Sequence, residues 1–588
     1  MRGVHSAVDD IRRDVFKEVA KLAYENGDDM EEQVDMIPYK IVPGEVAHYR
    51  SDVFLERAIV QERTRLALGM SLQPADKRTP ISTQIREAHT DAKYFDEPLV
   101  NIIPFACNAC PPKEVRITDS CQGCISHPCM NTCPKGAIYE DEQHHCHIDQ
   151  TKCIKCGKCF NQCPYHAISM IQRPCASACG MDAIGSDELG RAKINYDKCV
   201  SCGQCIVNCP FGAIADKSQI FQVIKAIKRN DEVIACVAPA FIGQFGPDAT
   251  PDKLEAAMRM LGFTDVVEVA IGADICAVDE AHDFLEEVPA KQPFMGTSCC
   301  PAWAMMARKQ FPEFADYISM ALTPMVITAR LVKFDCPEAK ICFIGPCSAK
   351  KLEANREEIR SYVDYVLTFE ELQGMFDAKN IDFSADMDVN PKECLDQGSD
   401  RARGFAVGGG VAASVVETVK HIAPDVELKV HYGDGLKECR KMLLMAKAGK
   451  YNGYLLEGMA CPGGCVAGAG TIQPVNKSMK HVADFQKEAD VYSCTECPYP
   501  DRWPDIDESL SGCADIVDDD TRNKAVAKAA KAKKLDLDME PHETVVQKTS
   551  PIKKASPLEN PTPAKEAAPA KDAAPAEEKK AEKPEEKK

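Results

Sequence analysis

The stretch that decides the fold of this chain is CIKCGKCFNQCP at residues 153–164, which returns as CVSCGQCIVNCP at residues 199–210. A third version, CQGCISHPCMNTCP at residues 121–134, has a longer gap before its third cysteine. Cysteines at this spacing place three thiolates in one tight loop, where they can bind one metal cluster. The proline after the last cysteine turns the chain away and carries no N–H. The three stretches therefore predict metal-binding loops.

These loops resemble those of bacterial-type ferredoxins, in which the fourth cysteine of one loop binds the neighbouring cluster. Applied here, that crossed rule predicts three sets of ligands, the third completed by a broken motif: Cys121, Cys124, Cys129 and Cys163; Cys153, Cys156, Cys159 and Cys133; Cys199, Cys202, Cys205 and Cys179. The cysteines that remain make a fourth set by elimination: Cys107, Cys110, Cys175 and Cys209. The sequence thus predicts four [4Fe–4S] clusters, with one ferredoxin-like pair inserted in the other.

Two alternatives stay open at these cysteines. Zinc is also bound by CxxC pairs, although compact CxxCxxC loops favour iron–sulfur clusters. Cys146, which lies in the run His144-His145-Cys146-His147, is left over by the four sets. It is either a free thiol, which is the preferred interpretation, or a metal ligand.

Composition narrows the class of protein further. The chain has 588 residues, 31 cysteines and a net charge of −19. A net negative charge argues against general nucleic-acid binding, which needs a basic face. We find no apolar stretch long enough to span a bilayer and no apolar signal core at the N-terminus, so we expect a cytoplasmic protein. In that reducing compartment the cysteines are expected to be metal ligands rather than disulfides.

The pattern along the chain predicts a multidomain α+β and α/β architecture. Residues 1–100 predict a helical region, and residues 101–215 predict the four-cluster region, with the inserted pair at 121–170. Residues 216–515 alternate β-rich runs with amphipathic stretches, which is typical of an α/β domain. Residues 516–588, rich in Lys, Ala, Pro and Glu, predict a largely disordered tail, with a docking tail as the alternative.

Individual elements follow from periodicity. Apolar residues at helical spacing predict helices at Val8–Tyr24 and Val53–Leu68. Short β-rich runs predict strands at four places: Glu232–Val237, Asp265–Ala270, Lys340–Ile344 and Tyr454–Glu457.

Three further cysteine motifs lie in the α/β region. They are TSCCPAW at residues 297–303, GPCSAKKLE at residues 345–353 and EGMACPGGCVAGAG at residues 457–470. In this order, and downstream of ferredoxin-like loops, they resemble the two-lobed H-cluster domain of [FeFe] hydrogenases, over about residues 105–510. The divergent positions look closest to the group B branch of that family.

The resemblance implies a specific site. Four cysteines would hold a [4Fe–4S] cubane: Cys300, Cys347, Cys461 and Cys465. Cys465 would also bridge to a two-iron subsite that bears CO, cyanide and an azadithiolate bridge. Lys350 would donate a hydrogen bond to a cyanide, and four residues would pack against the two-iron subsite: Met459, Phe405, Ala238 and Pro239.

The resemblance also implies a proton path. Cys299, beside the ligand Cys300, would be the thiol that passes protons to the bridging amine. Glu280 and Asp283 align with two acidic relay positions, and they share a helix face because they are three residues apart. Ser319 is predicted to connect them. The alternative is a solvated acidic helix face.

Four departures from the family pattern concern the surroundings of the cluster rather than its ligands. Gly345 stands where many members carry methionine, Ala240 replaces a serine, and Met325 follows Pro324 where glutamine is common. The third motif ends Gly468-Ala469-Gly470 rather than with three glycines. Changes of this kind shift potential and reactivity without removing the metal.

The activity implied by the resemblance is reversible reduction of protons to dihydrogen, with electrons from a ferredoxin-type carrier and a two-iron subsite installed by maturation proteins. The alternatives are a non-catalytic relative of the Narf type, a hydrogen sensor and a plain electron carrier. Retention of Cys299, Lys350, Met459 and Cys465 together favours the enzyme.

Overall fold

The computed structural model describes residues 5–25, 30–74, 79–83, 85–88, 97–356, 359–389 and 398–511. The predicted tail at 516–588 lies outside the described residues. The predicted mixture of a helical N-terminal region, small antiparallel ferredoxin-type units and an α/β domain is confirmed. Within the described part of the chain, no helix has both the length and the apolar content needed to cross a membrane.

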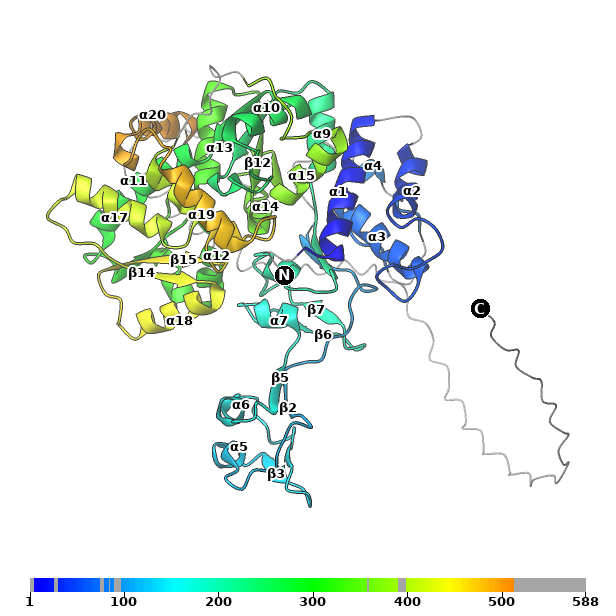
Figure 1. The fold of residues 1–588 in the computed structure, drawn as a ribbon. Coiled ribbons are helices and arrows are strands. Elements are labelled where there is room, and N and C mark those ends of the chain that lie inside the picture. The colour runs from blue at the N-terminus through cyan, green and yellow to red at the C-terminus, as the bar shows by residue number, and fades with distance from the viewer. Residues whose placement is uncertain are drawn as a thin grey trace, which may run out of the picture. The chain divides into compact units, whose positions relative to one another are not determined.

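The N-terminal region is helical. Its helices are α1 (Ala7–Glu25), α2 (Met30–Ile41), α3 (Val53–Ala67) and α4 (Ile85–Ala88). Helices α1 and α3 confirm the two predicted helices within a residue at each end, because both bury apolar residues at helical spacing. Helix α1 packs against α15 and α9 of the α/β domain, where Val15 and Val19 share a hydrophobic core with Phe369 (Figure 1).

The cysteine-rich region consists of short antiparallel pairs and single-turn helices. Its strands are β1 (Val100–Ile102), β2 (Glu114–Ile117), β3 (Ile138–Glu140), β4 (Cys146–Ile148), β5 (Ile168–Ile171), β6 (Ile184–Ser186), β7 (Ala192–Ile194) and β8 (Ile214–Asp216). Its helices are α5 (Pro128–Asn131), α6 (Lys158–Gln162), α7 (Pro174–Ala178) and α8 (Gln204–Val207). The pairs are β1 with β8, β2 with β5, β3 with β4 and β6 with β7. Because β2 pairs with β5, both ends of the inserted segment lie at one place.

The α/β domain is built on two parallel sheets, with orders β10-β9-β12-β13 and β11-β15-β14. The strands are β9 (Val233–Val237), β10 (Asp265–Glu268), β11 (Phe294–Gly296), β12 (Lys340–Gly345), β13 (Tyr365–Thr368), β14 (Lys429–Asp434) and β15 (Tyr454–Met459). The longer α-helices are α9 (Ile220–Lys228), α10 (Pro251–Leu261), α11 (Ala270–Glu287), α12 (Pro301–Gln310), α13 (Pro324–Asp335), α15 (Phe369–Lys379), α17 (Gly410–Ile422), α18 (Leu436–Lys447), α19 (Val475–Gln486) and α20 (Tyr499–Ser511). The shorter helices are α14 (Ser348–Ala354), α16 (Asp400–Arg403), η1 (Pro239–Phe241), η2 (Pro312–Tyr317), η3 (Gly404–Ala406), η4 (Cys465–Ala467) and η5 (Cys494–Glu496).

The four predicted strands are present with small shifts of their ends. The largest shifts are of two residues: β10 ends at Glu268 rather than at the predicted Ala270, and β15 ends at Met459 rather than at the predicted Glu457. Val269 already has helical backbone angles and caps α11, so the apolar run continues into the helix. Strand β9 is buried at every position, which is expected of a parallel strand covered on both faces.

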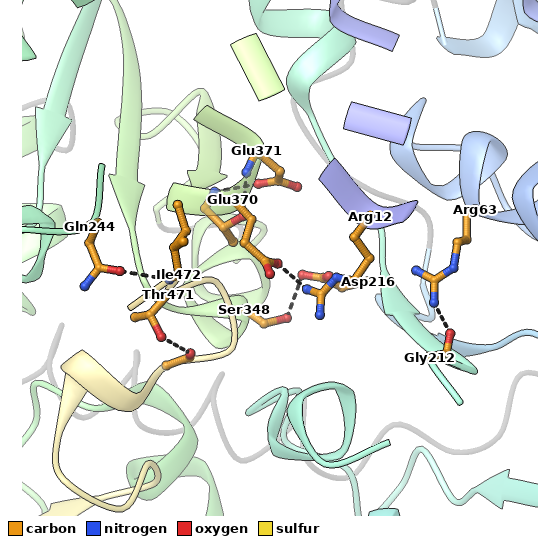
Figure 2. A network of polar contacts seen from close by, with 12 residues as sticks. Arg12, Arg63, Gly212, Asp216, Gln244, Ser348, Glu370, Glu371, Thr471 and Ile472 are labelled. Carbon is orange, nitrogen blue, oxygen red and sulfur yellow. Dashed lines mark hydrogen bonds and ion pairs between the residues drawn. The ribbon is translucent and has the colours of Figure 1, made fainter. Parts of the chain in front are cut away.

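A polar network holds the N-terminal region, the last strand of the cysteine-rich region and the α/β domain together (Figure 2). Arg12 of α1 forms an ion pair with Glu370 of α15. Asp216 of β8 accepts hydrogen bonds from Ser348 Oγ at 3.0 Å and from Lys351 Nζ at 3.1 Å. Since Ser348 directly follows Cys347, this network fixes the start of α14 against the cysteine-rich region.

Candidate metal centres

A large cavity lies where loops leave the carboxyl ends of parallel strands, the usual place for a site in an open α/β sheet. Its empty volume is about 860 Å³, part of which is open to solvent. Cys299 and Cys300 follow β11, Cys347 follows β12, and Cys461 follows β15. The cavity brings together every residue predicted to hold or to pack against the H-cluster: Ala238, Pro239, Cys299, Cys300, Cys347, Lys350, Phe405, Met459, Cys461 and Cys465.

Helix N-termini face this cavity at two of the cysteines. Cys300 is the N-cap of α12, and Cys347 is the N-cap of α14. Burial raises the pKa of both thiols, and the partial positive charge and N–H groups at the helix N-terminus offset part of that rise. The chain thus folds locally so that both cysteines are suited to bind a metal.

Lys350 supplies a charged group to an otherwise apolar wall. Its Nζ forms an ion pair with Glu353 Oε2 at 2.7 Å and makes no other polar contact among the described residues. Glu353 Oε1 accepts a hydrogen bond from Thr323 Oγ1 at 2.9 Å, which holds the carboxylate in place. A buried ammonium with free donors beside the cavity fits an anionic ligand such as cyanide. The thiolate set and this donor together fit the cluster that the sequence implies.

The predicted proton relay residues lie on and beside α11. Glu280 is fully buried, and its Oε1 accepts a hydrogen bond from the N–H of Ser298 at 2.6 Å. Burial raises the pKa of Glu280 to about 8. Asp283 is half-buried, and burial raises its pKa as well. Ser319 Oγ donates to Asp283 Oδ2 at 3.1 Å, so Ser319 lies on the Asp283 side of the predicted path.

Each of the other predicted cysteine sets also gathers in one place. Three of the sets line three separate small cavities: Cys107, Cys110, Cys175 and Cys209; Cys121, Cys124, Cys129 and Cys163; Cys133, Cys153, Cys156 and Cys159. In the fourth set, Cys179, Cys199 and Cys202 lie close enough to Cys205 to raise the pKa of its thiol. The set reached by elimination is therefore gathered in the same manner as the others.

A shared turn geometry explains why these loops bring their cysteines together. The residue before the second cysteine of each CxxC has positive φ: Ala109, Gly123, Lys155 and Ser201. The residue three after the last cysteine of each motif does too: Gly136, His166, Asp182 and Gly212. At three of these later turns the next N–H points at the cysteine sulfur, at 3.3 Å each: Ala137 to Cys133, Ala183 to Cys179 and Ala213 to Cys209. N–H groups aimed at sulfur stabilise a thiolate and tune the potential of a cluster.

The broken motif at Cys179 has a physical reason. Gly180 stands where the other three motifs have proline, and a Cβ at Gly180 would lie 2.4 Å from Leu436 Cβ. Helix α18 begins at Leu436, so the close approach of that helix excludes a side chain. The turn is otherwise unchanged, because Asp182 keeps its positive φ.

The Cys199–Cys205 loop reaches the large cavity itself. Cys202 lies beside the other cysteines of its predicted set and also lines the large cavity. A Cβ at Gly203, whose φ is +75°, would lie 2.3 Å from Ala469 Cβ, and Gln204 Nε2 donates to Ala467 O at 3.3 Å. This contact places one predicted cluster site directly beside the third motif.

The cysteine sets fit clusters better than single ions. Across the described ranges, no three or more His, Cys, Asp and Glu side chains come close enough to hold one metal ion. The Cys107, Cys121 and Cys153 sets each line a cavity instead, as does the Cys300 set, which is the arrangement needed by a cubane whose iron atoms take cysteine ligands at its corners.

Comparison with known proteins agrees with this geometry. A family described as "Iron only hydrogenase large subunit, C-terminal domain" matches residues 231–469, and "4Fe-4S binding domain" matches residues 147–169 and 192–215. The periplasmic [Fe] hydrogenase large subunit of Nitratidesulfovibrio vulgaris is 30% identical over 393 residues, which cover 58% of this chain and 90% of that protein. The chain belongs to the iron-only hydrogenase large-subunit family.

Two other relatives show the breadth of that family. Iron hydrogenase 1 of Clostridium pasteurianum is 29% identical over 462 residues, which cover 69% of this chain and 79% of that protein. Nuclear prelamin A recognition factor of Xenopus laevis is 24% identical over 386 residues, covering 55% of this chain and 84% of that protein. The similarity therefore extends to proteins that do not carry the hydrogenase name.

Two of the departures from the hydrogenase pattern, Ala240 and Met325, line the cavity, and Gly345 lies against a ring that lines it. A Cβ at Gly345 would lie 2.6 Å from the ring of Phe343, so that ring fills the space a methionine would need. Phe343 itself lines the cavity, together with Ala240 and Met325. This hydrogenase-family member thus has a more apolar wall than the pattern predicts.

Two buried residues near the relay were not predicted to have a role. Glu457 accepts hydrogen bonds from the N–H groups of Gly409 and Ala412, both at 2.8 Å, and burial raises its pKa to about 7. Cys276 lies one helical turn before Glu280 and is fully buried. The only sequence signal for Glu457 is its place at the start of the third motif.

Proposed function

We propose that this chain is an [FeFe] hydrogenase that reversibly reduces protons to dihydrogen. The observation that carries the proposal is the cavity shared by Cys299, Cys300, Cys347, Cys461 and Cys465. The first of these residues would be the proton-carrying thiol, and the other four would hold the cubane. When bound, the two-iron subsite would supply the centre at which electrons and protons combine.

Other residues of the chain would bind the subsite, exclude water from it and carry protons to it. Lys350 would bind a cyanide with its free donors, while Phe405, Met459, Ala238 and Pro239 would exclude water from the subsite. Protons would pass between Asp283, Ser319, Glu280 and the thiol of Cys299. A carboxyl group with a pKa near 8, such as that of Glu280, holds and releases a proton close to neutral pH.

Electrons would enter through four [4Fe–4S] clusters held by the four cysteine sets. Contact of the Cys199–Cys205 loop with the third motif supports that loop as the last step before the H-cluster. We propose a reduced ferredoxin-type carrier as the partner and dedicated maturation proteins as the source of the two-iron subsite. We propose a cytoplasmic location, because a reducing compartment suits cysteines that serve as metal ligands rather than disulfides.

The altered wall around the cavity supports placement in the group B branch. Gly345, Ala240 and Met325 are the positions that differ, and Phe343 takes the space beside the first of them. Differences at the wall would change the potential and rate rather than the reaction.

Infrared spectroscopy of anaerobically purified, matured protein tests the proposal. Sharp CO and CN stretches are expected, and they should vanish in Cys465→Ala but persist in Cys336→Ala, whose cysteine does not line the cavity. If the wild-type protein carries its full iron and sulfide yet shows no such bands after maturation, the chain is a non-catalytic member of the family, as the Narf-type alternative predicts.

A further inference from the structure

One cluster site has a fifth cysteine. The cavity lined by Cys121, Cys124, Cys129 and Cys163 is lined by Cys146 as well. Cys146 is 3% exposed, and its Sγ lies 3.7 Å from the Sγ of Cys129, within hydrogen-bonding range for sulfur. Its own N–H donates to Cys121 Sγ at 3.5 Å. The side chain and the backbone of Cys146 therefore contact two different predicted ligands.

The chain contains an internal control for this residue. Residues 129–163 and 175–209 repeat each other without a gap, so that Cys129, Cys146 and Cys163 correspond to Cys175, Ala192 and Cys209. In the hairpins, Cys146 pairs with Glu140 just as Ala192 pairs with Ser186.

The corresponding residue makes the same backbone contact. The N–H of Ala192 donates to Cys107 Sγ at 3.3 Å, and Ala192 lines the cavity of the Cys107 set. The backbone role is thus filled equally well by alanine. Compared with alanine at this position, Cys146 adds only a thiol, and that thiol lies against the predicted ligand Cys129.

We propose that Cys146 is a reserve ligand of this cluster: its thiol donates a hydrogen bond to the Cys129 sulfur and replaces Cys129 on the iron when that sulfur is lost. In the exchange the iron–sulfur bond to Cys129 breaks and one to Cys146 forms. The proton of the Cys146 thiol moves to the departing sulfur, or to solvent where that sulfur is absent, and no electron is transferred. The proposal rests on the proposed cluster at the Cys121 set.

Iron and sulfide content and the EPR spectrum of the reduced, full-length protein test the exchange. Cys129→Ala should keep the cluster, whereas Cys129→Ala/Cys146→Ala should lose it. The matched Cys175→Ala variant has alanine at the reserve position and should lose its cluster, and adding Ala192→Cys should restore it. Equal iron loss in Cys129→Ala and in the double variant would overturn the reserve role.

Cys146→Ala alone tests the hydrogen bond. It should keep full iron, since Ala192 shows that the hairpin accepts alanine, and the potential of this cluster should fall because a donor to sulfur is removed. An unchanged potential would overturn the hydrogen bond. The variant Cys121→Ala/Cys124→Ala tests the proposed cluster on which the reserve role rests. If this variant keeps all its iron, the proposed cluster itself is wrong.

Discussion

At the scale of single residues, the carboxyl group of Glu280 combines full burial with a hydrogen bond to only one of its two oxygens in the described part of the chain. It is fully buried on α11, one oxygen accepts from the N–H of Ser298, and the other has no hydrogen-bond partner there. Desolvation outweighs that single hydrogen bond, so the pKa rises to about 8. Such a group exchanges protons near neutral pH only if a path to solvent exists, and Asp283 with Ser319 lies one helical turn away.

Replacing Glu280 by glutamine tests this path. The change keeps the size and the hydrogen bond from Ser298 but removes the exchangeable proton, so hydrogen evolution should fall by about 10²- to 10⁴-fold. The infrared bands of the H-cluster should be unchanged. Asp279→Asn, on the same helix but outside the predicted relay, serves as the control. Full activity of Glu280→Gln would exclude this residue from the path.

Glu280 should also make stability depend on pH. Its folded pKa of about 8 lies above the ordinary value of 4.5, so the folded state binds the extra proton between these limits. The stability linked to this proton is fully present below pH 4.5 and is lost as pH rises through 8. Each unit of difference corresponds to about 1.4 kcal/mol. The Glu280→Gln variant should therefore lose less stability than the wild type between pH 5 and 9, as measured by denaturant unfolding. Parallel curves for the two proteins would show that the carboxyl group is not buried in solution.

At the scale of elements, the contacts of the cysteine loops bear on the proposed path of electrons. Gly203 and Gly157 begin α8 and α6 with nearly the same φ, +75° and +77°. A Cβ at Gly157 would meet only the flexible Met170 side chain, at 2.9 Å from its sulfur, whereas a Cβ at Gly203 would meet Ala469 at 2.3 Å. The two glycines therefore share their backbone requirement and differ in their packing.

The pair Gly203→Ala and Gly157→Ala separates these effects. Both changes place alanine in a left-handed conformation, which costs about 1 kcal/mol. Only Gly203→Ala adds overpacking, which costs a further ~1–3 kcal/mol. Gly203→Ala should therefore have the lower thermal midpoint, and it should slow reduction of the H-cluster by an external donor. Equal effects of the two variants would mean that the loop is not docked on the third motif.

A buried ion pair supports the cavity wall from behind. Arg403, just before η3, bonds Glu268 of β10 through Nε and Nη2, at 3.0 and 3.1 Å, and its guanidinium lies 3.8 Å from the centre of the Phe485 ring. Phe405 follows two residues later and lines the cavity. This pair holds the segment that presents Phe405.

Removing the arginine should be strongly destabilising. Arg403→Ala leaves the Glu268 carboxyl group buried without its partner, which costs about 3–5 kcal/mol in unfolding free energy. The exposed pair of Arg502 with Asp335, 3.2 Å apart, is the control, and Arg502→Ala should change stability by about 0–1 kcal/mol. Similar losses in both variants would contradict the burial of the first pair.

At the scale of the whole molecule, the two inserted cluster sites form a detachable unit. Strands β2 and β5 pair so that Ile117 lies opposite Ile168, and everything between them belongs to the inserted hairpins and loops. Replacing residues 118–167 by Asn-Gly should close this pair as a two-residue turn. The shortened protein should lose about eight iron atoms, four for each cluster, and keep its CO and CN bands. Loss of those bands as well would show that the unit is needed for assembly of the H-cluster site.

Cysteine spacing alone predicts which cysteines belong together in the loops, because cluster ligation depends on short spacings and tight turns. Periodicity likewise predicts the main helices and parallel strands, because it reflects burial on one face or both. The three motifs at 297–303, 345–353 and 457–470 predict the cavity residues only through a resemblance. No local pattern shows that strands so far apart in the chain lie together.

The surroundings of these groups are defined only in the folded chain. The pKa of Glu280, the contact of Ser319 with Asp283 and the approach of Cys146 to Cys129 all depend on what packs around each side chain. The replacement of proline by Gly180 likewise makes sense only beside α18, which begins at a residue far along the chain. Spacing specifies ligands within a loop, whereas desolvation and close contact arise between elements distant in sequence, so they become defined only when the chain is folded.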